Sequence, residues 1–181
     1  PRRARQRAVE LRFLTPDLRP LDGHPTEVLV GNLFEGERPP RGVAGLVNWR
    51  LGGRVDRLVE SGFLVGARGE VLLLPGRPRL EAEKVLLFGL GARADFDDAA
   101  FDLVAERLLQ TLLGLCVRSA VVELPGRHDD ALAPERAADR FLAAVAAHGG
   151  AFDAFVLVDG PDAQKRIQHH MVEERRRVRR G

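Results

Sequence analysis

The sequence has little of what stabilises secreted or membrane proteins. Its 181 residues contain one cysteine, Cys116, so no disulfide can form within the chain and we expect a reducing compartment. Cys116 lies inside an apolar helical pattern, and we interpret it as buried. The longest apolar runs, such as 71–74, fall far short of the roughly 18–20 residues of a spanning helix, and residues 8–14 lack the apolar segment of a secretory signal. We therefore expect a cytoplasmic protein without a membrane span.

Lysine is also scarce: of the 28 basic residues only Lys84 and Lys165 are lysines, and the others are arginines. Residues 1–12 carry a net charge of +4 and residues 173–180 carry +3, so the total of +2 leaves the body of the chain at −5. Arginine binds phosphates and carboxylates through a planar fork of donors. The candidate contact residues for nucleic acid or an acidic partner are Arg175, Arg176, Arg177, Arg179 and Arg180. The alternative is that both ends are solvated termini of an arginine-rich sequence.

The remaining pattern is that of a globular α/β domain with 45% hydrophobic residues. Strand-like runs occur at 9–14, 27–34, 70–74, 84–88, 120–124 and 154–158. Several of these runs are apolar throughout, which is typical of strands buried on both faces of a parallel sheet. Apolar residues recur at helical spacing in one stripe over 43–59, in 101–113 and in 138–145. The alternation predicts a three-layer α/β/α sandwich with a mixed, largely parallel sheet.

No motif typical of catalysis is visible. The densest histidine cluster, His128 with Asp129 and Asp130, is interpreted as a loop, because neighbouring residues there point in different directions. His169 and His170 face about 100° apart on a helix and do not converge on one ion. Neither serine lies in a nucleophile elbow. We therefore expect no metal, no cofactor and no catalytic residue.

The most promising glycine motif is Gly89-Leu90-Gly91-Ala92-Arg93-Ala94, which follows a strand and precedes a helix. It formally fits a dinucleotide-binding loop. The acidic residues at 95, 97 and 98 would lie where phosphate charge should be bound. We therefore interpret the segment as a tight turn in which Asp95 or Asp97 caps the following helix.

Several pieces of the sequence together resemble a known family. They are Val28-Leu29-Val30-Gly31 with Phe34-Glu35, then Leu51-Gly52-Gly53, then Gly66-Ala67-Arg68-Gly69-Glu70 before 71–74, and finally Lys84 to Gly91. Their order and spacing are similar to those of the N-terminal domain of the leucyl aminopeptidase family, over about residues 9–158. The resemblance implies a macro-domain-like fold. One departure is Asn48, which stands where the family has an Asp before the Leu-Gly-Gly segment.

The resemblance does not extend to the family's catalytic domain. That domain holds two metal ions through Lys, Asp and Glu residues, and its Asn-Thr-Asp-Ala-Glu-Gly-Arg stretch has no counterpart here. The resemblance therefore implies that this chain is not an enzyme. We assign residues 1–160 to an aminopeptidase N-terminal-like domain with a basic N-terminal arm. Residues 161–181 are assigned to an Arg-rich C-terminal helix opened by Pro161, with a thin apolar stripe.

The leading functional hypothesis is a stand-alone, non-catalytic module for protein interaction, oligomerisation or regulation. A second hypothesis follows from related macro domains, which bind ADP-ribose through loops after their strands. The corresponding candidate residues here are Asn32, Gly42, Gly45, Gly89 and Gly91. Two further alternatives are nucleic-acid binding through the Arg-rich ends and service as an accessory subunit of a separate metalloaminopeptidase.

Overall fold

The structure is a computed structural model that describes residues 9–178. The elements are β1 (Glu10–Leu14), α1 (Leu18–Asp22), β2 (Thr26–Leu33), α2 (Gly42–Arg50), α3 (Arg54–Glu60), β3 (Val71–Pro75), β4 (Ala82–Gly89), η1 (Arg93–Asp95), α4 (Asp98–Gly114), β5 (Ser119–Val122), η2 (Arg127–Asp129), α5 (Pro134–Ala147), β6 (Ala154–Val158) and α6 (Pro161–Val178). Among the described residues, no helix combines the length and apolar character needed to cross a bilayer.

All six strands form one sheet in the order β1-β6-β5-β2-β4-β3. β2 lies at the centre and pairs in parallel with both β4 and β5, while β3 runs antiparallel to β4 at one edge. β1 forms the other edge of the sheet in the described part of the chain and pairs in parallel with β6, in the register Glu10↔Ala154 to Leu14↔Val158. The carboxyl ends of five parallel strands therefore meet at one end of the sheet, where ligands bind in open α/β folds.

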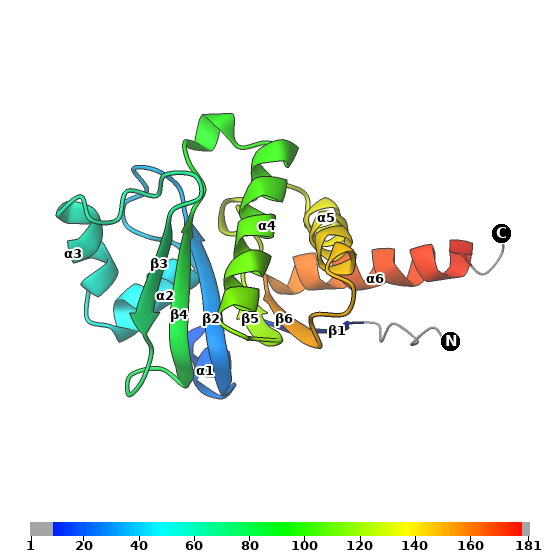
Figure 1. The fold of residues 1–181 in the computed structure, drawn as a ribbon, viewed down its shortest axis with the longest axis horizontal. Helices are drawn as coiled ribbons and strands as arrows, with labels where there is room; N and C mark the ends of the chain where they lie inside the picture. The colour runs from blue at the N-terminus through cyan, green and yellow to red at the C-terminus, as the bar shows by residue number, and fades with distance from the viewer. Residues whose placement is uncertain (1–8, 179–181) are drawn as a thin grey trace.

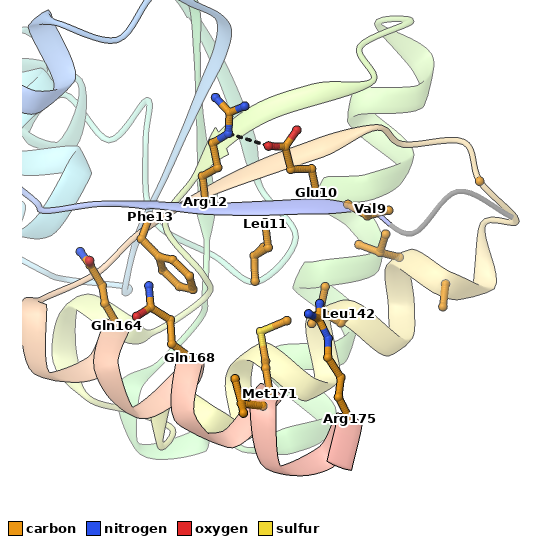
Figure 2. A pocket seen from close by; sticks show the side chains of 14 residues that line it. Val9, Glu10, Leu11, Arg12, Phe13, Leu142, Gln164, Gln168, Met171 and Arg175 are labelled. Atoms are coloured by element: carbon orange, nitrogen blue, oxygen red, sulfur yellow. Dashed lines mark hydrogen bonds and ion pairs between the residues drawn. The ribbon is translucent and has the colours of Figure 1, made fainter. Parts of the chain in front are cut away.

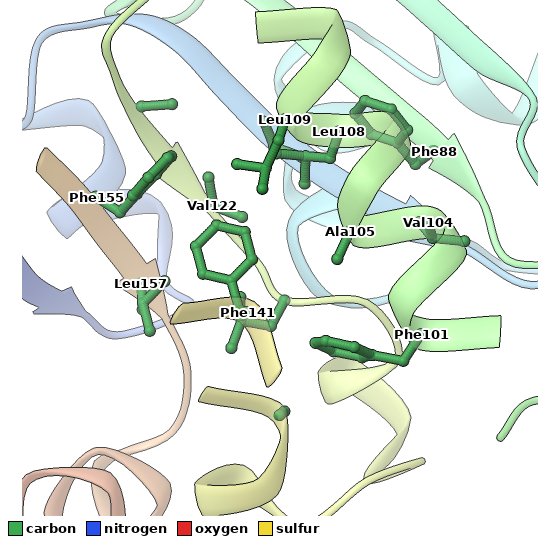
Figure 3. Close-up of a cluster of buried hydrophobic side chains, with 14 of the residues drawn as sticks. Phe88, Phe101, Val104, Ala105, Leu108, Leu109, Val122, Phe141, Phe155 and Leu157 are labelled. Atoms are coloured by element: carbon green, nitrogen blue, oxygen red, sulfur yellow. The ribbon is translucent and has the colours of Figure 1, made fainter. Parts of the chain in front are cut away.

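One face of the sheet is covered by α4, α5 and α6 (Figure 1). Phe101, Leu108 and Leu109 of α4 and Phe141 of α5 pack against Phe155 and neighbouring strand residues (Figure 3). α4 begins at Asp98, where the Asp97 side chain accepts a hydrogen bond of 2.9 Å from the Ala100 N–H. This N-cap confirms the prediction that an aspartate after the glycine motif caps the helix.

The opposite face is covered by α1, α2 and α3. The apolar stripe over 43–59 is divided between two helices rather than one, because Gly52 and Gly53 both have positive φ and interrupt the helical conformation between Arg50 and Arg54. Asn48, the departure from the family pattern, stabilises the start of α3: its Nδ2 donates to Asp56 Oδ2 at 2.7 Å, and its Oδ1 accepts from the Asp56 N–H at 3.0 Å.

The three-layer sandwich with a largely parallel sheet confirms the predicted fold class. The prediction for Cys116 was wrong, because its side chain is exposed. α4 ends at Gly114, two residues earlier, and Cys116 has a φ of 58°, a left-handed conformation that turns the chain towards β5. The helix opened by Pro161 is present, and Ile167 anchors it in the core as a fully buried residue.

Candidate functional site

A buried polar cluster lies at the carboxyl ends of the central strands. Asn32, near the end of β2, is fully buried, and its Nδ2 donates to the Glu123 carbonyl oxygen at 2.8 Å. Glu123 follows β5 directly, and its Oε2 accepts a hydrogen bond of 2.9 Å from the Val43 N–H at the beginning of α2. The carboxylate therefore lies where the amide groups of a helix N-terminus favour negative charge.

Gly42 is required at this point because α2 approaches Glu123 very closely. Its φ is +55°, and a Cβ on it would overlap the Glu123 Oε2 atom and lie 2.5 Å from the Cβ of His128. Burial raises the pKa of Glu123 to about 7, although the charge of His128 and the hydrogen bond from Val43 act in the opposite direction. Glu123 is thus a buried carboxyl group that titrates near neutrality.

His128 links this carboxyl group to a second one, Glu37. Its Nε2 lies 2.9 Å from Glu37 Oε2, and its Nδ1 lies 3.6 Å from Glu123 Oε1. Burial alone would lower the pKa of His128, but the hydrogen bond to Glu37 and the charges of both glutamates raise the pKa above its ordinary value. Burial alone would raise the pKa of Glu37, yet hydrogen bonds from His128 and from the Phe34 and Arg41 N–H groups lower that pKa.

Three buried atoms of the cluster, Asn32 Oδ1, Glu123 Oε1 and His128 Nδ1, have no hydrogen-bond partner within residues 9–178. All three side chains are closed off from solvent. The contact between Glu37, after β2, and His128, after β5, joins these two loops in the interior of the protein.

The glycine segment after β4 is also internally bonded. The Gly89 N–H donates to the Glu70 carbonyl at 2.9 Å, the Leu90 N–H to Leu33 at 3.0 Å, and the Gly91 N–H to Gly66 at 2.8 Å. A Cβ on Gly89 would overlap the Ala67 carbonyl, so this residue permits a close approach of two backbone segments. Three donors that a phosphate-binding loop would offer to a ligand are thus used inside the fold.

Two arginines in the loops near this end of the sheet, Arg41 and Arg93, bind the same carboxylate, that of Asp129. Arg41 NH1 lies 2.7 Å from Asp129 Oδ1, and Arg93 Nε lies 2.5 Å from Asp129 Oδ2. The hydrogen bond from Arg93, followed by that from Arg41, lowers the pKa of Asp129. The Arg93 guanidinium also lies over the Phe34 ring, 5.5 Å from its centroid. Across the part of the chain that the structure describes, no three His, Cys, Asp or Glu side chains are arranged to hold a metal ion.

The second feature is an open groove of about 920 Å³ between the edge strand β1 and the helices α5 and α6. Leu11 and Phe13 of β1 point into it, towards Met171 and Gln168 of α6, while Glu10 and Arg12 point to the opposite side of the strand (Figure 2). Leu142 and Val145 of α5 and Val172 and Arg175 of α6 complete most of the lining. The groove combines an apolar floor with an exposed strand edge.

The structure separates the residues predicted from sequence into two regions. Asn32, Gly42, Gly45, Gly89 and Gly91 all lie around the strand ends, where Gly45 allows α2 to pass the Pro40 carbonyl closely. Arg175 and Arg176 are exposed on α6, and Arg175 lines the groove. Arg177 belongs to α6, whereas Arg179 and Arg180 lie outside the described residues.

Sequence reasoning missed the cluster of Glu37, Glu123 and His128. The sequence pattern predicts a loop around His128. In the structure this residue lies in the short 3-10 helix η2, and its side chain is completely buried. The available signal was Glu123, a carboxylate that follows an apolar strand directly. Its partner Glu37 is distant in sequence, so no local spacing could pair them.

Comparison with known proteins identifies relatives of the domain. The model of the N-terminal domain of the cytosol aminopeptidase family matches residues 32–153. A probable cytosol aminopeptidase of Cupriavidus necator is 45% identical over 76 residues, covering 42% of this chain and 15% of the relative. The cytosol aminopeptidase of Pseudomonas aeruginosa is 34% identical over 114 residues, covering 63% of this chain and 23% of the relative. The chain thus spans less than a quarter of the length of these relatives.

Solved structures of several macrodomains have a similar fold. The macrodomain of Mycobacterium tuberculosis DarG has a TM-score of 0.64 at 17% identity, covering 84% of this chain and 99% of the other. A Trypanosoma brucei macrodomain in complex with ADP has a TM-score of 0.68 at 18% identity, covering 90% of this chain and 69% of the other. These identities establish a shared fold alone. Because the family match covers more than half of the chain, this protein belongs to the cytosol aminopeptidase family through its N-terminal domain.

Proposed function

We propose that this domain is a non-catalytic protein-interaction module that binds its partner along the groove between β1 and α6. The observation that carries the proposal is the groove itself, in which apolar side chains of β1, α5 and α6 line an open space beside a strand edge that no strand within residues 9–178 pairs with. Val172 in its wall is 46% exposed, so its side chain is accessible to a segment that binds in the groove.

At the carboxyl ends of the strands, by contrast with the groove, the groups that could bind a ligand are already bonded within the protein. The Glu123 carboxylate already accepts the hydrogen bond from the Val43 N–H at the beginning of α2, and Asp129 already forms ion pairs with Arg41 and Arg93. A ligand there would have to displace the chain's own carboxylates, whereas in the groove no side chain of residues 9–178 has to be displaced before a partner binds. We place the module in the cytoplasm, in keeping with the family's description as cytosol aminopeptidases.

A photo-crosslinking amino acid at Val172 tests the proposal in living cells. We expect discrete crosslinked species whose masses identify the partner. The matched control is the same amino acid at Trp49, which is 72% exposed on α2, on the other face of the sheet. The absence of any adduct at Val172, or equal adducts at both positions, would overturn the proposed function.

A crosslink from Val172 to a separate metallopeptidase chain would identify this module as an accessory subunit of that enzyme. The groove lies beside β1 and α6, far along the sheet from the β3 edge. None of Asn32, Glu37, Glu123 and His128 lines the groove, so the groove and the polar cluster are separate sites.

A second candidate function is nucleotide binding at the strand ends. It is favoured by the T. brucei macrodomain, whose solved complex contains ADP and whose fold this chain shares. Calorimetric titration with ADP and ADP-ribose tests it in the wild type and in Asp129→Ala, which removes the carboxylate that Arg41 and Arg93 share and leaves Arg41 paired with Glu37 alone. Binding that strengthens in Asp129→Ala would support an anion site at these arginines. No heat from either protein would end this candidate.

A further inference from the structure

The outer edge of β1 has backbone groups directed away from the sheet. The Glu10 N–H donates to the Asp153 carbonyl at 2.9 Å, and the Leu14 carbonyl accepts from the Asp159 N–H at 3.1 Å. Residues 10, 12 and 14 therefore use their backbone groups towards β6, and the alternate residues Leu11 and Phe13 direct theirs outwards. In the described chain no second strand lies beside β1. Such an edge is able to bind another strand.

The side chains of β1 select one register for an antiparallel partner of the same sequence. If Leu11 lies opposite Leu11 of a second copy, Glu10 lies opposite Arg12 of that copy and Arg12 opposite its Glu10. A shift of two residues in either direction places Arg12 opposite Arg12 or Glu10 opposite Glu10, and like charges directly opposite each other are unfavourable. A shift of one residue would bring inward-directed backbone groups to the interface.

The two sides of β1 also match this arrangement. Glu10 and Arg12 lie on the same face, where Arg12 Nε is 2.8 Å from Glu10 Oε1, and both side chains are more than half exposed. Leu11 and Phe13 lie on the other face, above the groove (Figure 2). A second β1 beside the first would continue the apolar row over Met171 and Val172, while the charges would pair on the opposite face.

We propose that the partner is a second copy of this chain, bound by antiparallel pairing of the two β1 strands about a two-fold axis at Leu11. This inference rests on the proposed function and names its partner. The contact is isologous, since each strand offers the same surface to the other, and the two sheets become one continuous sheet. Each interface then contains two Glu10–Arg12 pairs between the copies.

Charge reversal tests the register in the 181-residue chain. Light scattering after size exclusion, at several protein concentrations, is expected to give a dimer for the wild type. Arg12→Glu and Glu10→Arg each place like charges opposite each other twice, so each is expected to weaken the dimer about tenfold or more. The double variant carrying both changes restores opposite charges and is expected to dimerise like the wild type. Circular dichroism checks that all variants are folded.

The formation of a disulfide between the two copies tests the same strand register. In a Cys116→Ser background, which removes the exposed thiol, one preparation carries Glu10→Cys and another carries Arg12→Cys. In the proposed pairing these positions are directly opposite, at a spacing that a disulfide can bridge. Mild oxidation of the mixture is therefore expected to give a linked dimer, and oxidation of either variant alone is not.

The outcomes distinguish this inference from the proposed function. A wild-type monomer at all concentrations, or a dimer unaffected by Arg12→Glu, overturns the second-copy proposal. If the crosslinker at Val172 then captures a different protein, the interaction function stands with another partner. If it captures nothing, both fail. Failure of the double variant to recover, with its fold intact, rejects the register.

Discussion

At the scale of single residues, Glu123 has the most unusual environment among the described side chains. It is buried next to His128, and its carboxylate is bonded to the beginning of α2. Its raised pKa means that the folded protein retains a proton that the unfolded chain has already released above its ordinary pKa of 4.5. Glu123 therefore couples stability to pH.

The sign of this coupling follows from the directions of the pKa shifts. Glu123 reduces stability progressively as pH rises from 4.5 to about 7. His128, whose pKa is raised, contributes stability below pH 6.5 and loses it as pH rises through its folded pKa. Glu37, whose pKa is lowered, contributes stability above pH 4.5 and loses it as pH falls through its folded pKa. As pH rises above 4.5, Glu123 therefore lowers stability, and above pH 6.5 the loss of the His128 contribution adds to it, whereas the contribution of Glu37 is already present.

Replacing Glu123 by glutamine should flatten this decline. The glutamine oxygen still accepts the Val43 N–H but does not ionise, so a pH-dependent loss of about 2 kcal/mol between pH 5 and 7 should largely disappear. Urea unfolding at several pH values measures it. Glu83→Gln, at an exposed position, is the control and should leave the slope unchanged. An unchanged slope in Glu123→Gln would contradict this interpretation.

Gly42 offers a second residue-scale prediction. An alanine there would be held at positive φ and would overlap the Glu123 carboxylate, so we expect a loss of about 3 kcal/mol or more. Gly52 has a similar φ of +62° with open space around it, and Gly52→Ala should cost only about 1 kcal/mol. Denaturant unfolding compares the two. Equal costs would show that α2 can move away from Glu123.

Arg127 is the subject of a third prediction at the scale of single residues. Its buried guanidinium binds Asp159 through Nε at 2.7 Å and donates to the Leu132 carbonyl at 2.6 Å. Arg127→Met leaves Asp159 without this partner in a nearly closed site and should cost about 3–5 kcal/mol. Arg136→Met removes an exposed pair with Asp98 and should change little. Thermal unfolding distinguishes the two variants, and similar melting temperatures would refute the distinction.

At the scale of elements, α6 depends on few apolar contacts. Ile167 is its fully buried residue, and an ion pair from Arg166 to Glu135 and a hydrogen bond between His170 and Asp139 join it to α5. Both contacts are partly exposed and contribute little. The position of α6, and with it one wall of the groove, is therefore maintained by Ile167 together with the buried Ala163 and the partly buried Met171.

Ile167→Ala should consequently loosen α6 before the rest of the fold. We expect a loss of about 2–4 kcal/mol and faster amide hydrogen exchange concentrated in residues 161–178. The half-exposed Val172 supplies the control, since Val172→Ala should leave both quantities almost unchanged in the monomer. Uniformly faster exchange across the sheet would show that α6 is an inseparable part of the core.

The sequence predicted elements well where apolar residues alone determined them. The run 154–158 coincides with β6, and the run 84–88 lies within β4, because strands buried on both faces need apolar side chains throughout. The division of 43–59 into α2 and α3 depends on the backbone conformation of Gly52 and Gly53, which apolar spacing does not report. The polar cluster escaped prediction because Glu37 and His128 become neighbours only after β2 and β5 pair.

At the scale of the whole molecule, charge is distributed unevenly along the chain. The body carries −5, whereas the two terminal segments carry +4 and +3. Nucleic-acid binding through these arginines stays a prediction. It requires affinity that falls steeply with salt and is lost when Arg175, Arg176, Arg177, Arg179 and Arg180 are all changed to glutamine. Fluorescence anisotropy with a labelled duplex measures both. Salt-independent binding would indicate a different contact.

The pairing of β1 with β6 has a consequence for synthesis. Glu10 and Ala154 are neighbours in the sheet but are separated by nearly the whole chain, so β1 leaves the ribosome long before its partner exists. Until β6 emerges, the self-complementary segment 10–14 has no native strand to bind. On a polysome, where several nascent copies are close together, the same pairing that we propose for the folded dimer could form too early. Slow completion of this edge is therefore a stage at which assembly and misassembly compete.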